Sequence, residues 1–225
     1  MQYGLLVVAL LFAACDWVAV ARDRRRLEMI CKPATMVAVV FAVLTQAWAG
    51  TPGFEDEWLA RFFVPAFTLS LIGDVFLMLR RERLFLAGLG AFLLAHVCYI
   101  IGLNATTPPW PSVAVLVPVA GGGTILLQRL AEGLRRRGQK RMLAPVAMYS
   151  VVLSLMLYSA WTTLLRPEWG KIRAWLAAIG ASLFFISDSM LAWDRFVTSF
   201  PKARLWIHVT YHLGQMALAA SVLGP

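Results

Sequence analysis

Long, nearly uninterrupted apolar stretches constrain the fold of this chain more than any other feature. A helix that spans a bilayer needs about 20 predominantly apolar residues. Eight stretches of roughly that length cover residues 3–21, 33–50, 59–79, 85–104, 112–130, 143–165, 173–193 and 206–223. Because 60% of the 225 residues are hydrophobic and the connecting segments are short, the sequence predicts a single all-α, polytopic membrane domain over residues 1–225, with eight transmembrane helices.

The basic residues indicate how this domain is oriented. A net charge of +9 would suggest nucleic acid binding in a soluble protein, but here most lysines and arginines fall in alternate loops. The first, third, fifth and seventh loops hold five, three, six and three of them, and basic loops stay in the cytoplasm. We therefore expect both termini outside, anionic membrane lipids rather than nucleic acid as partners, and, from the compact loops and the lack of a targeting extension, a bacterial inner membrane.

Two aspartates, Asp74 and Asp188, lie inside predicted spans. A carboxylate in hydrocarbon costs about 2.5–3.5 kcal/mol, so such residues usually have a function or a partner. Both follow a small residue and precede a leucine by three positions, and each lies six residues before the cytoplasmic end of its span. Six residues of helix rise about 9 Å, so we predict that the two carboxyls meet at one depth in the bundle. A purely structural role, as polar contacts between helices, is the alternative.

Five other polar residues are candidates for the site, namely Lys32, His96, Tyr99, Tyr211 and Gln215. Those of the second and eighth spans approach the depth of the aspartates, whereas His96 matches it only if the fourth span begins late, near residue 88 or 90. His208, Tyr211 and Gln215 are spaced three and four apart, so they share one helix face. Asp16 is a third buried acid, for which pairing with loop arginines is an equally good interpretation.

The chain also contains a possible internal repeat. His96-Val97-Cys98-Tyr99 resembles His208-Val209-Thr210-Tyr211, and each segment follows its aspartate by a similar interval. This similarity is compatible with two parallel halves of four spans each. The three cysteines form no paired motif, so we expect no disulfide framework, metal site or cofactor.

Several motifs together resemble the YhhN family. The matching segments are residues 67–79 (FTLSLIGDVFLML), 88–99 (GLGAFLLAHVCY), 180–192 (GASLFFISDSMLA), 211–215 (YHLGQ) and the Lys-Pro pair at 32–33. That family contains the lysoplasmalogenases, which are eight-span membrane enzymes. The resemblance implies an ether hydrolase that cleaves the vinyl ether bond of lysoplasmalogen, a single-chain lysophospholipid, to a fatty aldehyde and glycerophosphoethanolamine or glycerophosphocholine. It also implies that Asp74 and Asp188 are the catalytic pair.

This chemistry suits two carboxyl groups. Protonation of the outer alkene carbon of a vinyl ether gives an oxocarbenium ion, to which water adds, as in glycoside hydrolysis. One aspartic acid would deliver the proton and the other would stabilise the cation and direct the water. We expect Lys32 to hold the substrate phosphate, and His96, Tyr99, Tyr211 and Gln215 to contact substrate or water.

Three other functions fit the same residues. Intramembrane acids also occur in small secondary transporters and proton-coupled carriers. The chain could instead be a non-catalytic lipid-binding or scaffold protein, or a hydrolase of a different enol ether or of an epoxide. Transporter sites usually lie near the bilayer midplane, whereas these aspartates are predicted toward one face, which favours an enzyme.

Overall fold

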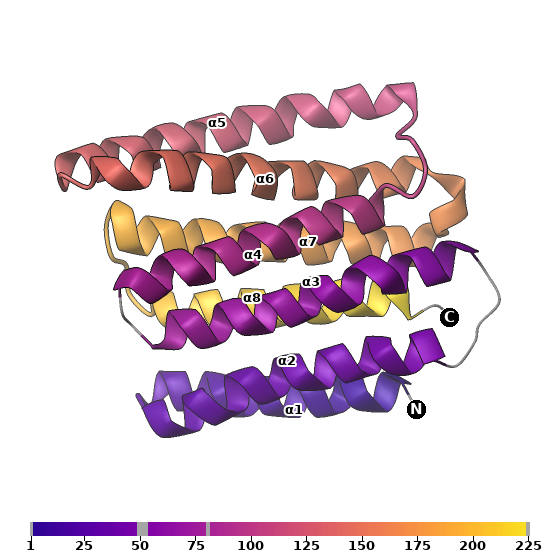
Figure 1. Cartoon of the computed structure of the whole chain (residues 1–225), viewed down its shortest axis with the longest axis horizontal. Helices are drawn as coiled ribbons and strands as arrows, with labels where there is room; N and C mark the ends of the chain where they lie inside the picture. The colour runs from indigo at the N-terminus through magenta and orange to yellow at the C-terminus, as the bar shows by residue number, and fades with distance from the viewer. Residues whose placement is uncertain (1, 49–53, 80–81, 224–225) are drawn as a thin grey trace.

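The computed structural model describes residues 2–48, 54–79 and 82–223, and it consists of eight long helices packed side by side (Figure 1). These helices are α1 (Gln2–Ala21), α2 (Arg25–Trp48), α3 (Phe54–Met78), α4 (Glu82–Leu103), α5 (Val113–Arg136), α6 (Leu143–Thr162), α7 (Lys171–Phe196) and α8 (Ala203–Val222). Four single turns of 3-10 helix are η1 (Trp110–Ser112), η2 (Lys140–Met142), η3 (Thr163–Leu165) and η4 (Pro167–Trp169). Over these ranges the chain contains no strand, as the all-α prediction requires.

The helices form layers in which α8 is central. Helices α1 and α2 lie at one side of the bundle, α5 and α6 lie at the other, and α3, α4, α7 and α8 fill the middle (Figure 1). Helix α8 contacts α1, α2, α3 and α7, so side chains from most of the bundle can meet around it. The connections after α1, α5 and α7 lie at the end of the bundle where α3 ends and α4 begins, whereas α1 begins and α8 ends at the other end (Figure 1).

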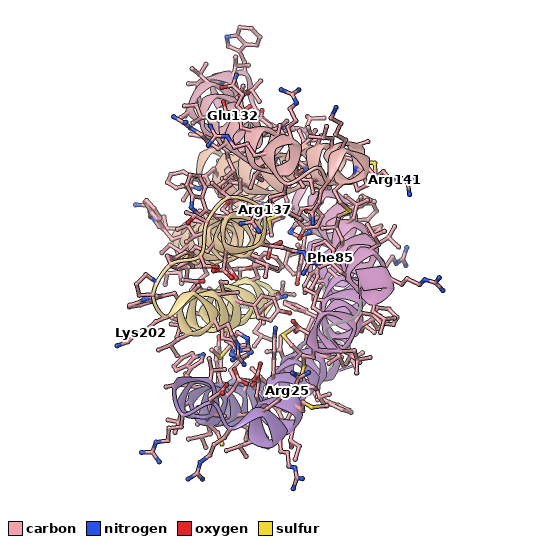
Figure 2. The ribbon with its side chains drawn as sticks, turned by 90° about the vertical axis from the view of Figure 1, so that its left-hand side faces the viewer. Arg25, Phe85, Glu132, Arg137, Arg141 and Lys202 are labelled. Atoms are coloured by element: carbon pink, nitrogen blue, oxygen red, sulfur yellow. The ribbon has the colours of Figure 1, made fainter. Side chains whose placement is uncertain are left out.

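The end with these connections is rich in basic residues. Figure 2 looks onto it and shows Arg25, Arg137, Arg141 and Lys202 there. The predicted basic loops therefore share one end of the bundle, and their cytoplasmic location stays a prediction. Arg80 and Arg81 of the third basic loop lie outside the described residues.

Seven helices, α1 to α7, are long and apolar enough to cross a membrane, judged on the part of the chain that the structure describes. Helix α8 also has 20 residues, but Arg204, His208, His212 and Gln215 lower its hydropathy. The polytopic architecture is thus confirmed for seven helices. The eighth span, the outward termini and the repeat of four spans stay predictions.

Helix α2 begins earlier than the sequence indicated. The predicted span started at residue 33, whereas the helix starts at Arg25 and contains Pro33 in its interior. A proline inside a helix removes one backbone hydrogen bond, but helices in membrane bundles tolerate this where neighbouring groups compensate. The earlier start turns Glu28 and Lys32 into the bundle, where their side chains are largely buried.

Small residues bring the central helices together. A Cβ atom on Gly180 of α7 would lie 2.8 Å from the backbone nitrogen of Leu218 and 2.9 Å from the carbonyl oxygen of Gly214, both on α8. Only glycine permits this approach of two backbones, which is the usual way that helices associate tightly in membranes. Gly73 of α3 similarly accommodates the ring of Phe92 on α4. These contacts fix the helices that carry Asp74 and Asp188.

Candidate active site

Asp74 is held by two side chains from other helices. The ammonium nitrogen of Lys32 on α2 lies 2.8 Å from Asp74 Oδ1, and the hydroxyl of Tyr211 on α8 donates a 2.6 Å hydrogen bond to Oδ2. The Asp74 side chain is 1% exposed and that of Lys32 is 10% exposed. A buried carboxylate is stable only when it is paired and hydrogen-bonded, and Asp74 satisfies both conditions.

A chain of hydrogen bonds continues from this carboxylate toward α4. Gln215 Nε2 donates to the Tyr211 hydroxyl over 3.2 Å, and the Tyr99 hydroxyl donates to Gln215 Oε1 over 2.7 Å. Every donor in the chain therefore points toward Asp74, and aligned hydrogen bonds polarise one another. The arrangement stabilises negative charge on Asp74, and it brings together four of the predicted residues: Lys32, Tyr99, Tyr211 and Gln215.

Asp188 has a different environment. The hydroxyl of Tyr149 on α6 donates a hydrogen bond to Asp188 Oδ2. Asp188 also lines a narrow groove, with a cavity volume of about 40 Å³, whose other walls come from α3, α4, α5 and α6. The lining is largely apolar and consists of Leu77, Phe85, Leu89, Phe92, Leu126, Val146, Tyr149, Ser150, Leu153, Asp188, Ser189, Leu191, Ala192 and Phe196. Apolar walls beside a carboxyl group suit a substrate that has an apolar chain and a reactive polar group.

The two aspartates have separate partners, and the side chain of Phe92 lies between their surroundings. Lys32 and Tyr211 hold Asp74, whereas Tyr149 holds Asp188, and no hydrogen bond joins the two carboxyls within the described ranges. Phe92 links the two environments, because its ring lines the groove and packs edge-on against Tyr211, with ring centroids 6.0 Å apart. Direct sharing of one proton between the two acids therefore stays a prediction.

His96 lies with Tyr149 rather than with Asp74. Its side chain is buried, and its Nδ1 lies 2.6 Å from the carbonyl oxygen of Phe92. Because a carbonyl oxygen only accepts, Nδ1 carries the hydrogen, and Nε2 is a buried acceptor without a hydrogen-bond partner among the described residues. The imidazole packs edge-on against the rings of Tyr149 and Phe184, at centroid distances of 5.4 and 4.7 Å.

Asp16 belongs to a second polar cluster. His208 Nδ1 lies 2.7 Å from Asp16 Oδ2, and the indole nitrogen of Trp17 donates to His212 Nδ1 over 3.2 Å. Arg204 pairs with Asp23 and Glu28 and not with Asp16, so the alternative of direct pairing with loop arginines does not hold for these side chains. The predicted face of His208, Tyr211 and Gln215 is therefore divided, because His208 faces Asp16, whereas Tyr211 bonds to Asp74 and Gln215 bonds to Tyr211.

Tyr149 is the one site residue that sequence reasoning missed. It follows the basic residue Arg141 by eight positions, which corresponds to about 12 Å of helix and to a depth close to that predicted for the aspartates. Two signals could have identified Tyr149: this depth, and the fact that the chain has only five tyrosines. No group of three His, Cys, Asp or Glu side chains in the described residues is placed to hold a metal ion.

Comparison with known proteins identifies the family. The sequence profile of the YhhN family matches residues 27–222. Lysoplasmalogenase TMEM86B of Mus musculus is 34% identical over 195 residues, which are 86% of this chain and 73% of that protein. The lysoplasmalogenase of Mycobacterium bovis is 31% identical over 194 residues, 84% of this chain and 69% of that protein. Lysoplasmalogenase TMEM86B of Homo sapiens is 32% identical over 160 residues, 70% of this chain and 62% of that protein.

Seven long apolar helices and buried acids between them define an integral membrane protein. The chain belongs to the YhhN family, as its motifs predicted. Its relatives identify it as an enzyme, which was also predicted. No solved structure matches the chain.

Proposed function

We propose that this protein is a lysoplasmalogenase, a membrane-embedded ether hydrolase. Its substrate would be a 1-alkenyl lysophospholipid with an ethanolamine or choline headgroup, and its products a fatty aldehyde and the corresponding glycerophosphodiester. The observation that carries the proposal is the pair of buried aspartates, one ion-paired and one beside an apolar groove, in a chain related to enzymes of that name. The basic loops at one end of the bundle support an orientation with that end in the cytoplasm, and we keep the bacterial inner membrane as the proposed location.

The two aspartates would have different roles because their partners differ. Lys32 and Tyr211 both favour an ionised Asp74, which suits a general base. Asp188 forms no ion pair among the described residues, and it borders an apolar groove, an environment that favours the neutral acid. We therefore assign the general acid to Asp188 and the general base to Asp74. In the same scheme Lys32 keeps Asp74 ionised, in place of the phosphate contact that the sequence suggested.

The assignment gives a balanced reaction. Asp188 transfers its proton to the outer alkene carbon, and the vinyl ether becomes an oxocarbenium ion. Water adds to the carbon beside the ether oxygen and gives its proton to Asp74, which produces a hemiacetal. Asp188 then removes the hemiacetal proton while Asp74 protonates the departing glycerol oxygen, so that the C–O bond breaks and the aldehyde forms. Both carboxyls return to their starting state, and neither a metal nor an oxidant takes part.

Hydrolysis of a defined substrate tests the proposal. Purified protein in detergent should release aldehyde from lysoplasmenylethanolamine and none from the saturated 1-alkyl analogue, which cannot form an oxocarbenium ion by protonation. Asp188→Asn and Asp74→Asn should each lower kcat by at least about a hundredfold, the order of a general acid or base contribution. Glu132→Gln makes a similar carboxylate-to-amide change at an exposed residue of α5 outside the groove lining, and this control should stay within about threefold of wild type.

A transporter would give the opposite results. Sealed vesicles would then show substrate flux, and the mixture would contain no aldehyde. Full turnover in both asparagine variants would exclude the paired-carboxyl mechanism even if aldehyde is released.

A further inference from the structure

We propose that a crevice between α5 and α6 binds the hydrocarbon chain of the substrate, as a continuation of the groove beside Asp188. The occupant is the single alkenyl chain of the lysophospholipid, whose vinyl ether end lies in the groove. This assignment rests on the proposed function and adds to it the place and direction of the chain.

The crevice and the groove are adjacent spaces of different size. The crevice has a cavity volume of about 200 Å³, and Ser150 of α6 lines both it and the groove. The groove has a cavity volume of about 40 Å³, which is room for about three water molecules at roughly 10–15 Å³ each. That space suits the reactive group of the substrate but not a long chain, which therefore needs the neighbouring crevice.

The crevice presents an apolar surface although several of its side chains carry hydroxyl groups. Ser150 Oγ donates a 2.9 Å hydrogen bond to the carbonyl oxygen of Val146, and Ser154 Oγ donates a 2.8 Å bond to that of Ser150. The hydroxyl of Tyr158 lies 3.0 Å from Ser112 Oγ. These hydroxyls are thus bonded within the protein, and most of the remaining lining is aliphatic or glycine. Such a surface suits a hydrocarbon chain rather than a polar headgroup.

The crevice runs in the direction of a lipid chain. Helix α5 ends and α6 begins at the basic end of the bundle (Figure 1). On α6 the lining extends from Ser150 to Tyr158, so the crevice leads away from the basic end. A lysolipid in the leaflet on that side has its headgroup near the basic end and its chain in the hydrocarbon core, which is about 30 Å thick. The chain and the crevice are therefore parallel.

The positions of small residues define how much of the chain the crevice can hold. A Cβ atom on Gly123 of α5 would lie 2.6 Å from Ser154 Oγ, so these two residues face each other. Ser154 lies four residues beyond Ser150, and Ala120 lies three residues beyond Gly123 in the same direction, because the helices are antiparallel. Seven residues of helix rise about 10 Å. An extended chain advances about 1.25 Å per carbon, so Ala120 is about eight carbons from Ser150 along the crevice.

Ala120→Phe tests the assignment, with Ala114→Phe as the matched control. Both alanines are exposed on α5, but only Ala120 lines the crevice. With a lysoplasmalogen that has a 16-carbon chain, Ala120→Phe should raise KM about tenfold with little change in kcat, because the ring occupies the space of the chain. With a six-carbon chain, which does not reach residue 120, the variant should match wild type. Ala114→Phe should match wild type on both substrates.

Two kinetic results would overturn the assignment. One is an equal KM for the long-chain substrate in the Ala120→Phe and Ala114→Phe proteins. The other is an equal loss on the long and short substrates, which would indicate a general disturbance of α5.

A labelling experiment keeps this inference separate from the hydrolase proposal. The probe is a saturated 16-carbon 1-alkyl lysophospholipid, which is not cleaved, with a photoreactive diazirine at the eighth carbon of its chain. In wild-type protein it should label the crevice face of α5 or α6, the unlabelled lipid should compete, and Ala120→Phe should abolish the labelling. Labelling of other helices, or labelling without competition as expected for bulk lipid, refutes the inference. Crevice labelling without aldehyde release from lysoplasmalogen refutes only the proposed reaction.

Discussion

Replacement of Lys32 by methionine should destabilise the protein strongly, because the ion pair with Asp74 is buried. Asp74 is 1% exposed and lies 2.8 Å from the ammonium, so the variant would leave a carboxylate in a site without its cation. Removal of one partner of a buried ion pair costs about 3–5 kcal/mol. The hydrogen bond from Tyr211 to Asp74 remains, and methionine preserves most of the buried side-chain volume, so we expect the lower part of this range.

The double variant Lys32→Met/Asp74→Asn should recover most of the lost stability. Asparagine is neutral and can still accept the Tyr211 hydrogen bond, and replacement of both charged partners is often close to neutral. Unfolding in detergent, followed by tryptophan fluorescence, measures the free energy of each variant without reference to activity. Lys140→Met makes the same chemical change at an exposed lysine and should alter stability by less than about 0.5 kcal/mol. A double variant as unstable as Lys32→Met would refute the argument from charge pairing.

Three further predictions follow from single contacts. Tyr149→Phe removes the hydrogen bond to the second aspartate and should lower kcat for aldehyde release about tenfold or more while KM changes little. Gly180→Val should force α7 and α8 apart and lower the free energy of unfolding in detergent by more than about 2 kcal/mol. Gly121→Val is the control and should be tolerated, because a Cβ atom at Gly121 would meet no neighbouring atom within contact distance. The hydrogen bond from Thr106 lowers the pKa of Glu168. The resulting stabilisation is fully present above the usual carboxyl pKa and is lost as pH falls through the lowered one, so Thr106→Val should reduce stability by up to about 0.5 kcal/mol at pH 7 and by progressively less at acidic pH.

The helices themselves were predictable because a bilayer imposes their length and composition. Runs of apolar residues identified all eight long helices, and α1 to α7 qualify as spans. The start of α2 was less predictable, since Pro33 resembles a helix boundary while the eight residues before it are too polar to register in a hydropathy pattern. The helix continues through these residues because ion pairs inside the bundle stabilise their charges. Glu28 pairs with Arg204, and Lys32 pairs with Asp74.

The site was predictable only in part. Spacing along α8 correctly placed Tyr211 and Gln215 on one face, but it gave no information on which helix that face meets. That is why His208 was grouped with them although it reaches Asp16. Tyr149 was missed because a single tyrosine in an apolar helix has no pattern of its own, and only the packing of α6 against α7 brings its hydroxyl to Asp188.

The backbone contact between α7 and α8 determines which helices can move when a substrate enters. With Gly180 against Gly214, the helix of Asp188 and the helix of Tyr211 behave as one unit. The opposite wall of the groove includes Leu126 of α5, and only 6% of the span that contains α5 is buried. Admission of a lipid tail from the side should therefore displace the outermost helix and leave the distance between the two acids unchanged, so that catalytic geometry does not depend on how wide the entrance opens.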